Sequence, residues 1–144
     1  KNFVATHPSG ALAAAMILVN EIMATGKGIP LVNYNTSVKE AVVEMSKKNL
    51  GIVCVKEKNG KINLITDGDI RRNSNNLYKK KIIKICNKNP TWVSDNDTAI
   101  SAINKMNSLE ITTLLVARHR DTKKKIKNVV GVLHLHHCLN AGIK

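Results

Sequence analysis

The chain has 144 residues, of which 43% are apolar and only 3% aromatic, and it carries a formal net charge of +13. This length suits one ordinary domain or two very small ones, and no apolar stretch is long enough to cross a bilayer. The charge comes almost entirely from Lys, and the few aromatic residues are scattered, unlike the stacking surfaces of nucleic-acid binders. We therefore expect neither nucleic acid nor a membrane as a partner.

The first 17 residues precede any repeating pattern. Residues 11–19 are apolar, but they lack the length of a membrane span and the basic flank of a signal peptide. They follow His7 and Pro8 closely, which indicates a chain that begins inside a longer protein. We expect residues 1–17 to be the tail and linker of a preceding domain.

Two stretches of the chain repeat one pattern. Residues 32–45 and 93–106 each begin with an extended piece, pass an Asn- and Thr-rich turn and continue as an amphipathic helix. The apolar positions at helical spacing are Val38, Ala41, Val42 and Met45 in the first stretch and Ala99, Ala102, Ile103 and Met106 in the second. Thr36 or Ser37 is predicted to cap the first helix, and Asp97 or Thr98 the second.

A β-rich hairpin follows each predicted helix. In the first copy, strands at 51–55 and 62–65 flank a tip in which Asn59-Gly60 signals a two-residue turn. In the second copy, strands at 112–116 and 129–133 flank a longer polar tip. A closing helix follows each hairpin.

The doubled order of strand, helix, strand, strand and helix predicts an α+β fold. We expect two βαββα units, at residues 18–77 and 78–144, related by pseudo-twofold symmetry with a cleft between them. A unit of about 60 residues is marginal alone, since it buries a small share of its surface, so the two are expected to share a core.

Cysteine usage suggests the compartment. Cys54, Cys86 and Cys138 are far apart and odd in number, and Cys54 lies in an apolar run. A buried free thiol is expected there rather than a disulfide, which favours a reducing, cytoplasmic setting.

The stretch “TDGDIRR”, which begins at Thr66, lies where a strand ends and a helix begins. In one interpretation Thr66 and Asp69 form a capping box that satisfies backbone N–H groups. In the other they bind a ligand: Thr66 gives a hydroxyl to a phosphate or ribose, and Asp69 accepts from both ribose hydroxyls. Gly68 would then allow close approach, and Arg71 or Arg72 would add a charge-assisted bond to phosphate. Both interpretations are open from the sequence.

These features resemble a known family. Paired units with a Gly-apolar-x-Thr-x-x-Asp signature resemble tandem cystathionine-β-synthase (CBS) domains, the Bateman module. The strings “HPSGAL” from His7, “TDGDIRR” from Thr66 and “GVLHLH” from Gly131 are similar to the C-terminal part of arabinose-5-phosphate isomerases. In that family an N-terminal SIS domain precedes a CBS pair, so the resemblance implies that residues 1–17 are the tail of a SIS domain.

The resemblance also implies a role. The family interconverts ribulose 5-phosphate and arabinose 5-phosphate for the synthesis of Kdo, a lipopolysaccharide sugar. The CBS pair would need no cofactor, would sense a nucleotide or nucleotide-sugar such as AMP, ATP or CMP-Kdo, and would act on its own SIS domain. His7 matches the family's proposed catalytic His, but without the rest of the SIS domain it has no proton partner, so we expect no catalysis from this chain.

The other wall of the ligand site is likewise implied by the resemblance. Ile29 and Pro30 would contribute from one segment, and Ile52 and Val53 from another. Ile29 and Val53 would pack on the face of a base while backbone groups read its edge.

The second copy departs from this pattern because His134 and His137 stand where Thr66 and Asp69 stand. An imidazole cannot accept from two vicinal hydroxyls as a carboxylate does, so a second ribose site is not favoured. Contact with a ligand phosphate or an acidic sugar is the open alternative. No metal site is expected with Cys138, because ligands crowded across one strand end seldom converge on a single ion.

A structural module that binds no ligand is the alternative function. CBS pairs commonly dimerise through their helices, and the apolar faces at residues 38–45 and 99–106 would suit a homodimer.

Overall fold

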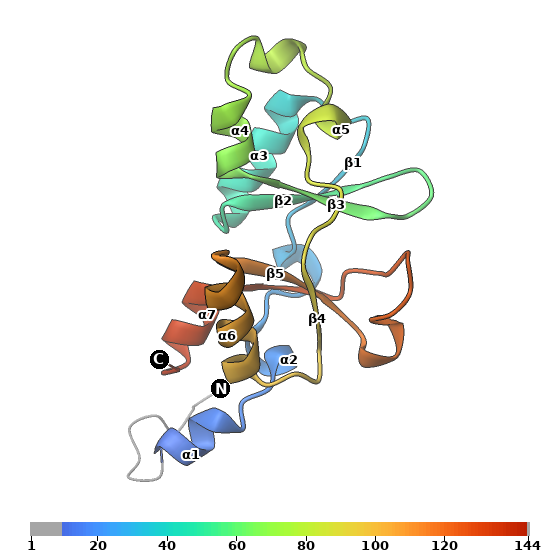
Figure 1. Cartoon of the computed structure of the whole chain (residues 1–144). Helices are drawn as coiled ribbons and strands as arrows, with labels where there is room; N and C mark the ends of the chain where they lie inside the picture. Colours follow the sequence, from blue (N-terminus) through green and yellow to red (C-terminus); the bar gives the residue numbers. More distant parts are fainter. Residues whose placement is uncertain (1–9, 144) are drawn as a thin grey trace. The chain divides into compact units, whose positions relative to one another are not determined.

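A computed structural model describes residues 10–143, which form two compact units. The first-repeat unit consists of Lys27–Pro90 and Lys124–Asn128. The second-repeat unit consists of the described residues up to Gly26, Thr91–Lys123 and the residues from Val129 onward (Figure 1). Each unit is described by itself below.

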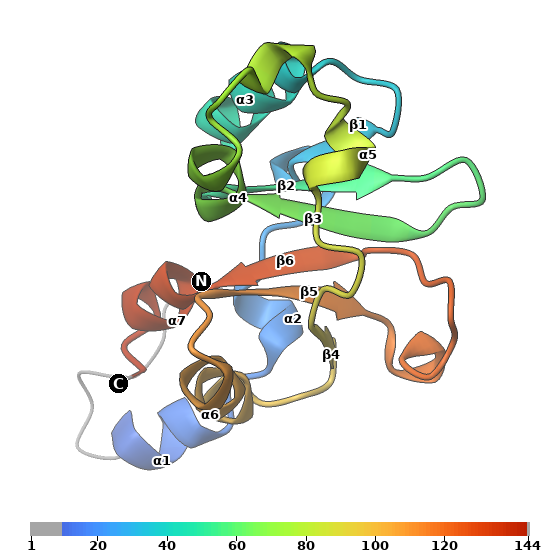
Figure 2. The same cartoon turned by 45° about the horizontal axis from the view of Figure 1, so that its top comes forward.

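The first-repeat unit contains a three-stranded sheet in the order β1-β2-β3. β1 (Leu31–Asn33) pairs in parallel with β2 (Ile52–Lys56), which pairs antiparallel with β3 (Ile62–Thr66). α3 (Val38–Lys48) connects β1 to β2, and α4 (Asp67–Arg72) follows β3. Figures 1 and 2 show α3 and α4 on the same face of this sheet.

The predicted apolar face of α3 is its inner face. Val38, Ala41 and Met45 are buried in one cluster with strand residues that include Val53. The hydroxyl of Ser37 accepts from the backbone N–H of Glu40 at 3.1 Å, which confirms a cap at this position.

The second-repeat unit repeats the same order of elements. Its elements are β4 (Trp92–Ser94), α6 (Ala99–Leu109), β5 (Thr113–Ala117), β6 (Gly131–His134) and α7 (Leu135–Asn140). β4 is parallel to β5, and β5 is antiparallel to β6. Thr98 caps α6 by accepting from the N–H of Ser101 at 3.1 Å. The α+β class and the doubled order are therefore confirmed. Further short elements include α1 (Gly10–Ala15), η1 (Gly26–Gly28), η2 (Leu77–Lys79) and η3 (His119–Asp121).

The first hairpin differs from the predicted two-residue turn. The N–H of Glu57 donates to the carbonyl of Lys61 at 2.8 Å, and the N–H of Gly60 donates to the carbonyl of Glu57 at 2.9 Å. Gly60 has a φ of 93°. The prediction was wrong because a longer turn that ends in a left-handed Gly also matches the twist of the two strands.

Each unit contains the segment that leads into the other repeat. α2 (Val19–Ile22) precedes the first repeat, but the adjoining Ala24 pairs with Val132 of β6 through two backbone hydrogen bonds of 2.9 and 3.0 Å. Asn87 precedes the second repeat, but it pairs with Leu64 of β3 through bonds of 2.7 and 3.0 Å. Leu64 and Val132 are equivalent strand positions, so the exchange is reciprocal.

The exchanged segments complete the cores. α5 (Ile82–Ile85) belongs to the lead-in of the second repeat, yet Ile82 and Ile85 are buried in the core of the first-repeat unit. Conversely, Val19 is buried in the core of the second-repeat unit. Neither repeat has a complete core from its own residues.

The helix faces that suggested a dimer contact lie inside the units. The apolar residues at 38–45 and 99–106 are mostly buried against their own sheets, so a partner chain has no access to them. On α3, α6 and α7 the exposed large apolar side chains are Val43, Leu109 and Leu139. No helix within residues 10–143 has the length and apolar character that a membrane span requires.

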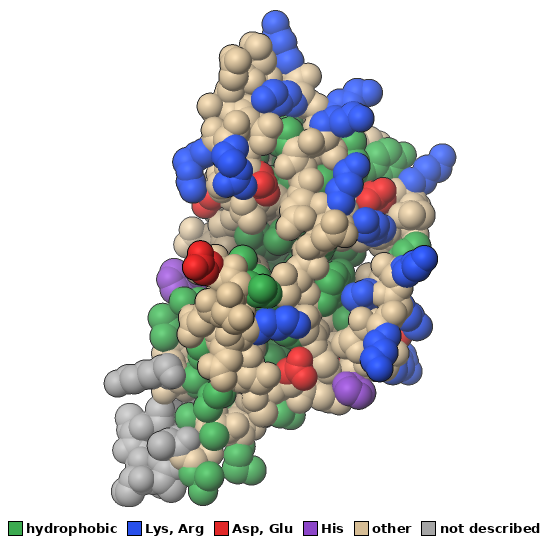
Figure 3. Space-filling view, viewed as in Figure 1, with side chains coloured by type: hydrophobic (Ala, Val, Ile, Leu, Met, Phe, Trp, Pro, Cys, Tyr) green, Lys and Arg blue, Asp and Glu red, His purple; other side chains and the backbone are tan. Residues whose placement is uncertain are grey.

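The net charge is concentrated in one unit. The first-repeat unit contains 17 of the 23 Lys and Arg residues and five of the ten acids, which gives it a formal charge of +12. The rest of the chain carries six basic and five acidic residues, a charge of +1. Figure 3 shows Lys and Arg side chains spread over the first-repeat unit. Such a potential attracts anions.

We predict that Ile82→Ala destabilises the first-repeat unit, although Ile82 lies in the lead-in of the second repeat. Truncating a buried Ile to Ala costs about 2–5 kcal/mol of unfolding free energy. Denaturant unfolding measures the loss, and the amide signals of β2 and β3 identify the affected unit. The half-buried neighbour Ile83 provides the matched control, Ile83→Ala, which should cost clearly less. A loss confined to the signals of β5 and β6 would contradict the exchange.

Candidate functional site

The junction between β3 and α4 is a reciprocal cap. Thr66 Oγ1 accepts from the N–H of Asp69 at 3.2 Å, and Asp69 Oδ2 accepts from the N–H of Thr66 at 2.9 Å. The N–H of Asp67 donates to the carbonyl of Gly51 at 3.0 Å, which fastens the helix start to the beginning of β2. The capping-box interpretation is confirmed.

The second carboxylate oxygen of Asp69 pairs with Arg72. The distance from Asp69 Oδ1 to Arg72 Nη2 is 2.6 Å, and the two side chains are 16% and 70% exposed. A Cβ added to Gly68 would lie 3.0 Å from Arg72 Nη1, so the guanidinium folds back over the helix start. Gly68 therefore makes room for Arg72, while Arg71 is exposed. The Asp69 carboxylate is turned inward rather than into bulk water.

Two of the predicted residues lie together at one end of the sheet. Ile52 pairs with Thr66 in the β2–β3 register. The N–H of Cys54 donates to the carbonyl of Pro30 at 2.9 Å, which fastens the segment before β1 to β2. Because residues paired in an antiparallel register project to one face, the side chains of Ile52 and Thr66 share a face. Ile29 lies in the bend before β1 and is partly exposed.

Val53 does not belong to this face. Its side chain is fully buried in the core cluster that includes Val38 and Met45 of α3. The prediction that its side chain packs on a base is wrong, because neighbours along a strand point to opposite faces. Ile52 is the β2 side chain that shares a face with Thr66.

The second-repeat junction is capped in a similar way by imidazoles, except that the His134 ring accepts from the residue two positions on instead of three. The N–H of His134 donates to His137 Nδ1 at 3.0 Å, and the N–H of His136 donates to His134 Nδ1 at 3.0 Å. The N–H of Leu135 donates to the carbonyl of Thr112 at 2.9 Å, as in the equivalent bond of the first junction. Ring nitrogens thus replace the hydroxyl and carboxylate oxygens as acceptors.

The surroundings of this junction disfavour the protonated form of two of its histidines. Partial burial lowers the pKa of both His134 and His137, and the adjacent His136 lowers both further. Among residues 10–143, no group of three or more His, Cys, Asp or Glu side chains is arranged to hold a metal ion. His7 lies outside the described residues.

The three cysteines are free thiols. Burial raises the pKa of Cys54 to about 12 and that of Cys138 to about 11. Burial also raises the pKa of the half-buried Cys86. These thiols stay protonated at neutral pH, so they are poor nucleophiles and poor metal ligands.

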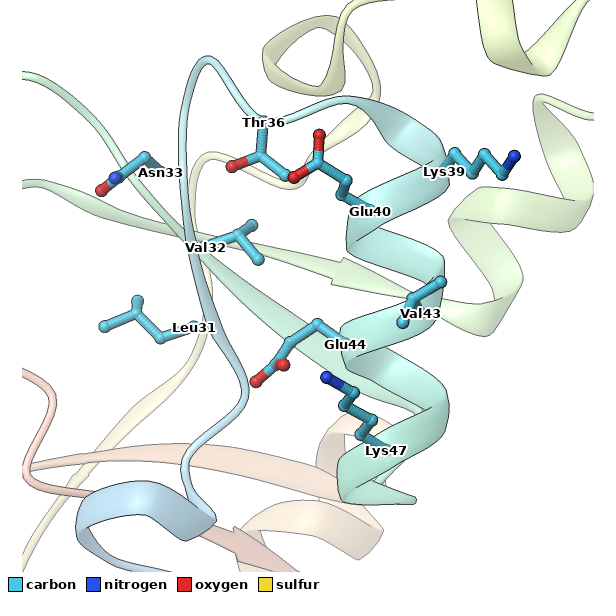
Figure 4. A pocket seen from close by; sticks show the side chains of 9 residues that line it. All are labelled: Leu31, Val32, Asn33, Thr36, Lys39, Glu40, Val43, Glu44 and Lys47. Carbon is cyan, nitrogen blue, oxygen red and sulfur yellow. The ribbon is translucent and has the colours of Figure 1, made fainter.

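Two hollows of the first-repeat unit lie near the first junction or beside β1. One has a volume of ≈ 180 Å³, and its lining includes Gly51 and Asp67 of the junction. The other, of ≈ 480 Å³, lies between β1 and α3, where Val32 points toward the helix and Glu44 toward the strand (Figure 4). The linings of these two hollows contain none of the predicted site residues.

We predict that the stability of the second-repeat unit falls as the pH drops below 6.5, the ordinary pKa of His. The pKa values of His134 and His137 are lowered in the folded chain, so the unfolded chain binds protons at a higher pH. The contribution of the two histidines to the free energy of unfolding is therefore complete above pH 6.5. It is lost as the pH falls through their lowered pKa values in the folded chain. Protonation at Nδ1 also removes the acceptors of the cap.

Thermal unfolding from about pH 8 to about pH 5 measures this effect, since His titrates in that range. His137→Asp keeps an acceptor without an imidazole, so it should flatten the acid side of the profile. Identical acid slopes for the parent chain and His137→Asp would contradict the assignment.

A family model described as “CBS domain” matches residues 19–76 and 82–144. Arabinose 5-phosphate isomerase KdsD of Yersinia pestis is 34% identical over 148 residues, which cover 99% of this chain and 43% of that protein. The same enzyme of Francisella tularensis is 34% identical over 140 residues, covering 94% and 41%. Uncharacterized protein RP505 of Rickettsia prowazekii is 33% identical over 144 residues, covering 99% and 43%. The chain spans less than half the length of these curated relatives.

Solved structures share the fold. The crystal structure of CBSX2 in complex with AMP superposes with a TM-score of 0.72 at 19% identity, covering 87% of this chain and 95% of that chain. The CBS domain pair of protein MJ0100, in complex with 5′-methylthioadenosine and S-adenosyl-L-methionine, gives a TM-score of 0.72 at 22% identity, covering 87% and 94%. At these identities the likeness concerns the fold.

Proposed function

The chain belongs to the CBS-domain family, and from that premise we propose that it is the regulatory, ligand-binding pair of an arabinose-5-phosphate isomerase. The identity to enzymes of that name extends over 94–99% of the chain, which supports the proposal. In the whole protein the pair would control the interconversion of arabinose 5-phosphate and ribulose 5-phosphate on the route to Kdo and lipopolysaccharide. It would act on its own SIS domain in the cytoplasm and carry no catalytic machinery itself.

The proposed ligand is a nucleotide or a nucleotide-sugar. Proteins of the same fold are described in complex with AMP and with S-adenosyl-L-methionine, and CMP-Kdo is a further candidate as an end product. The observation that carries the proposal is the first junction. The side chain of Ile52 lies on the same face as the Thr66 hydroxyl, and the carboxylate of Asp69 lies one helical turn on. The partly exposed Ile29 of the segment before β1 would add apolar surface. A base, a phosphate and a ribose diol need these three kinds of group.

Ligand binding at this junction would displace Arg72 from Asp69. The Arg72 side chain is 70% exposed, so its ion pair is worth at most about 1 kcal/mol and is easily exchanged for a ribose diol. Asp69 Oδ2 would keep its bond to the N–H of Thr66, so the helix start would persist. The released guanidinium would be placed to pair with a phosphate. The +12 charge of the first-repeat unit also favours an anionic ligand.

We predict that a nucleotide or nucleotide-sugar raises the melting temperature of the chain. Binding to the folded state adds about 2.7 kcal/mol at a hundredfold excess over the dissociation constant. Thermal melting with AMP, ATP, CMP and CMP-Kdo, followed by calorimetry, identifies the ligand. The absence of a shift with all four compounds would remove the proposal.

The variant Asp69→Asn ties the melting shift to this junction. An amide oxygen can still accept from the N–H of Thr66, but it cannot accept from two ribose hydroxyls as a carboxylate does. We expect the ligand-induced shift to disappear while the fold is kept. Asp67→Asn, which changes the exposed acid of the same turn, is the matched control and should retain the shift.

We predict that Arg72→Ala separates the two roles of the guanidinium. Removing Arg72 frees Asp69 Oδ1, so adenosine should bind more tightly than it binds the parent chain. AMP should not bind more tightly, because the variant lacks the guanidinium that would pair with the phosphate. The ratio of the AMP affinity to the adenosine affinity should therefore fall by about tenfold. Calorimetry with both ligands measures the ratio, with Arg71→Ala as the control. An unchanged ratio would show that Arg72 does not contact the phosphate.

A further inference from the structure

The second-repeat junction presents hydrogen-bond donors where the first presents acceptors. The Nδ1 atoms of His134 and His137 each accept a backbone N–H at 3.0 Å. A neutral imidazole that accepts at Nδ1 carries its proton on Nε2. Both rings therefore offer an Nε2–H donor and have no acceptor left. Asp69, at the position equivalent to His137, offers only acceptors.

A third donor belongs to the same junction. Thr113 pairs with His134 in the β5–β6 register, so the two side chains project to one face of the sheet. Thr113 is 7% exposed, and among the described residues its hydroxyl has no hydrogen-bond partner. A buried hydroxyl without a partner is destabilising. The equivalent position in the first repeat is the apolar Ile52, so this hydroxyl is particular to the second junction.

We infer that the second-repeat junction is an anion site, which binds a carboxylate or a phosphate through the Nε2–H groups of His134 and His137 and the hydroxyl of Thr113. An anionic oxygen satisfies several donors at once, whereas a ribose diol needs acceptors that this junction lacks. The identity of the anion as the acidic part of an effector rests on the proposed function. The site itself is defined by its own three donors.

Nitrogen-15 NMR of the histidine rings in the chain tests the site directly. At neutral pH, His134 and His137 should both show the Nε2–H tautomer. Inorganic phosphate and acetate are then titrated separately, with adenosine as the uncharged comparison. We expect phosphate, acetate or both to shift these two Nε2–H signals, and the anion that acts identifies the preferred group. The Nδ1–H tautomer, or no shift with either anion, overturns the inference.

A hydroxyl deletion supplies the second test. Thr113→Val removes the unpartnered hydroxyl at constant shape, so the melting temperature without ligand should be unchanged or higher. Affinity for the active anion should fall by about tenfold. Thr112→Val, at the exposed neighbouring position, is the matched control and should keep the affinity. Unchanged anion affinity in Thr113→Val overturns the role of the hydroxyl.

The two proposals fail independently. If nucleotides bind nowhere but an anion shifts the rings of His134 and His137, the proposed function is wrong and the anion site remains. If Asp69→Asn abolishes a nucleotide response that leaves both rings unaffected, and no anion reaches them, the nucleotide site stands and the anion site is wrong.

Discussion

A backbone N–H at the end of a strand must find an acceptor when the next residue begins a helix, and this requirement shapes both repeats. In the first repeat the acceptor for Thr66 is the carboxylate of Asp69, and in the second the acceptor for His134 is the ring of His137. In both cases this N–H is bonded by the side chain three residues on, because the constraint is the same. The hydrogen-bond donors and acceptors that the cap does not use differ between the two junctions, and they decide what each junction can bind.

The exchange of lead-in segments adds a second constraint. Ala24 closes the edge of β6 and Asn87 closes the edge of β3, so each sheet pairs with residues that precede the other repeat. Edge strands expose unpaired N–H and C=O groups, and this pairing covers part of them. It also explains why Ile82, which precedes the second repeat, is a core residue of the first-repeat unit. In the same way Val19, which precedes the first repeat, is a core residue of the second-repeat unit. The segment around Val19, which would lie nearest a preceding domain, is thereby fastened to the second-repeat unit and not to the first.

Much of this architecture could be predicted from local patterns. The apolar spacing of α3 and α6 and the caps at Ser37 and Thr98 depend on neighbouring residues, so they are visible in the sequence. The exchange could not be predicted, because no local signal distinguishes pairing with one repeat from pairing with the other. The orientation of Val53 was available from strand alternation, since Ile52 pairs with Thr66 and its neighbour must point away. The bond between Asp69 and Arg72 depends on a side-chain conformation that residue type alone does not determine.

The second junction has a histidine where a carboxylate would be the better cap, and this supports a functional role. A carboxylate at position 137 would accept the N–H of His134 at every physiological pH and would favour the positive end of a helix. An imidazole loses its acceptor on protonation and then adds an unfavourable charge at that end. The unpartnered hydroxyl of Thr113 is on the residue that pairs with His134, and the equivalent residue of the first repeat is Ile52. The imidazole cap and the unpartnered hydroxyl are both destabilising, which is hard to reconcile with a purely structural junction. An anion would compensate for both because it would accept from the Nε2–H groups and the hydroxyl, which are otherwise unused.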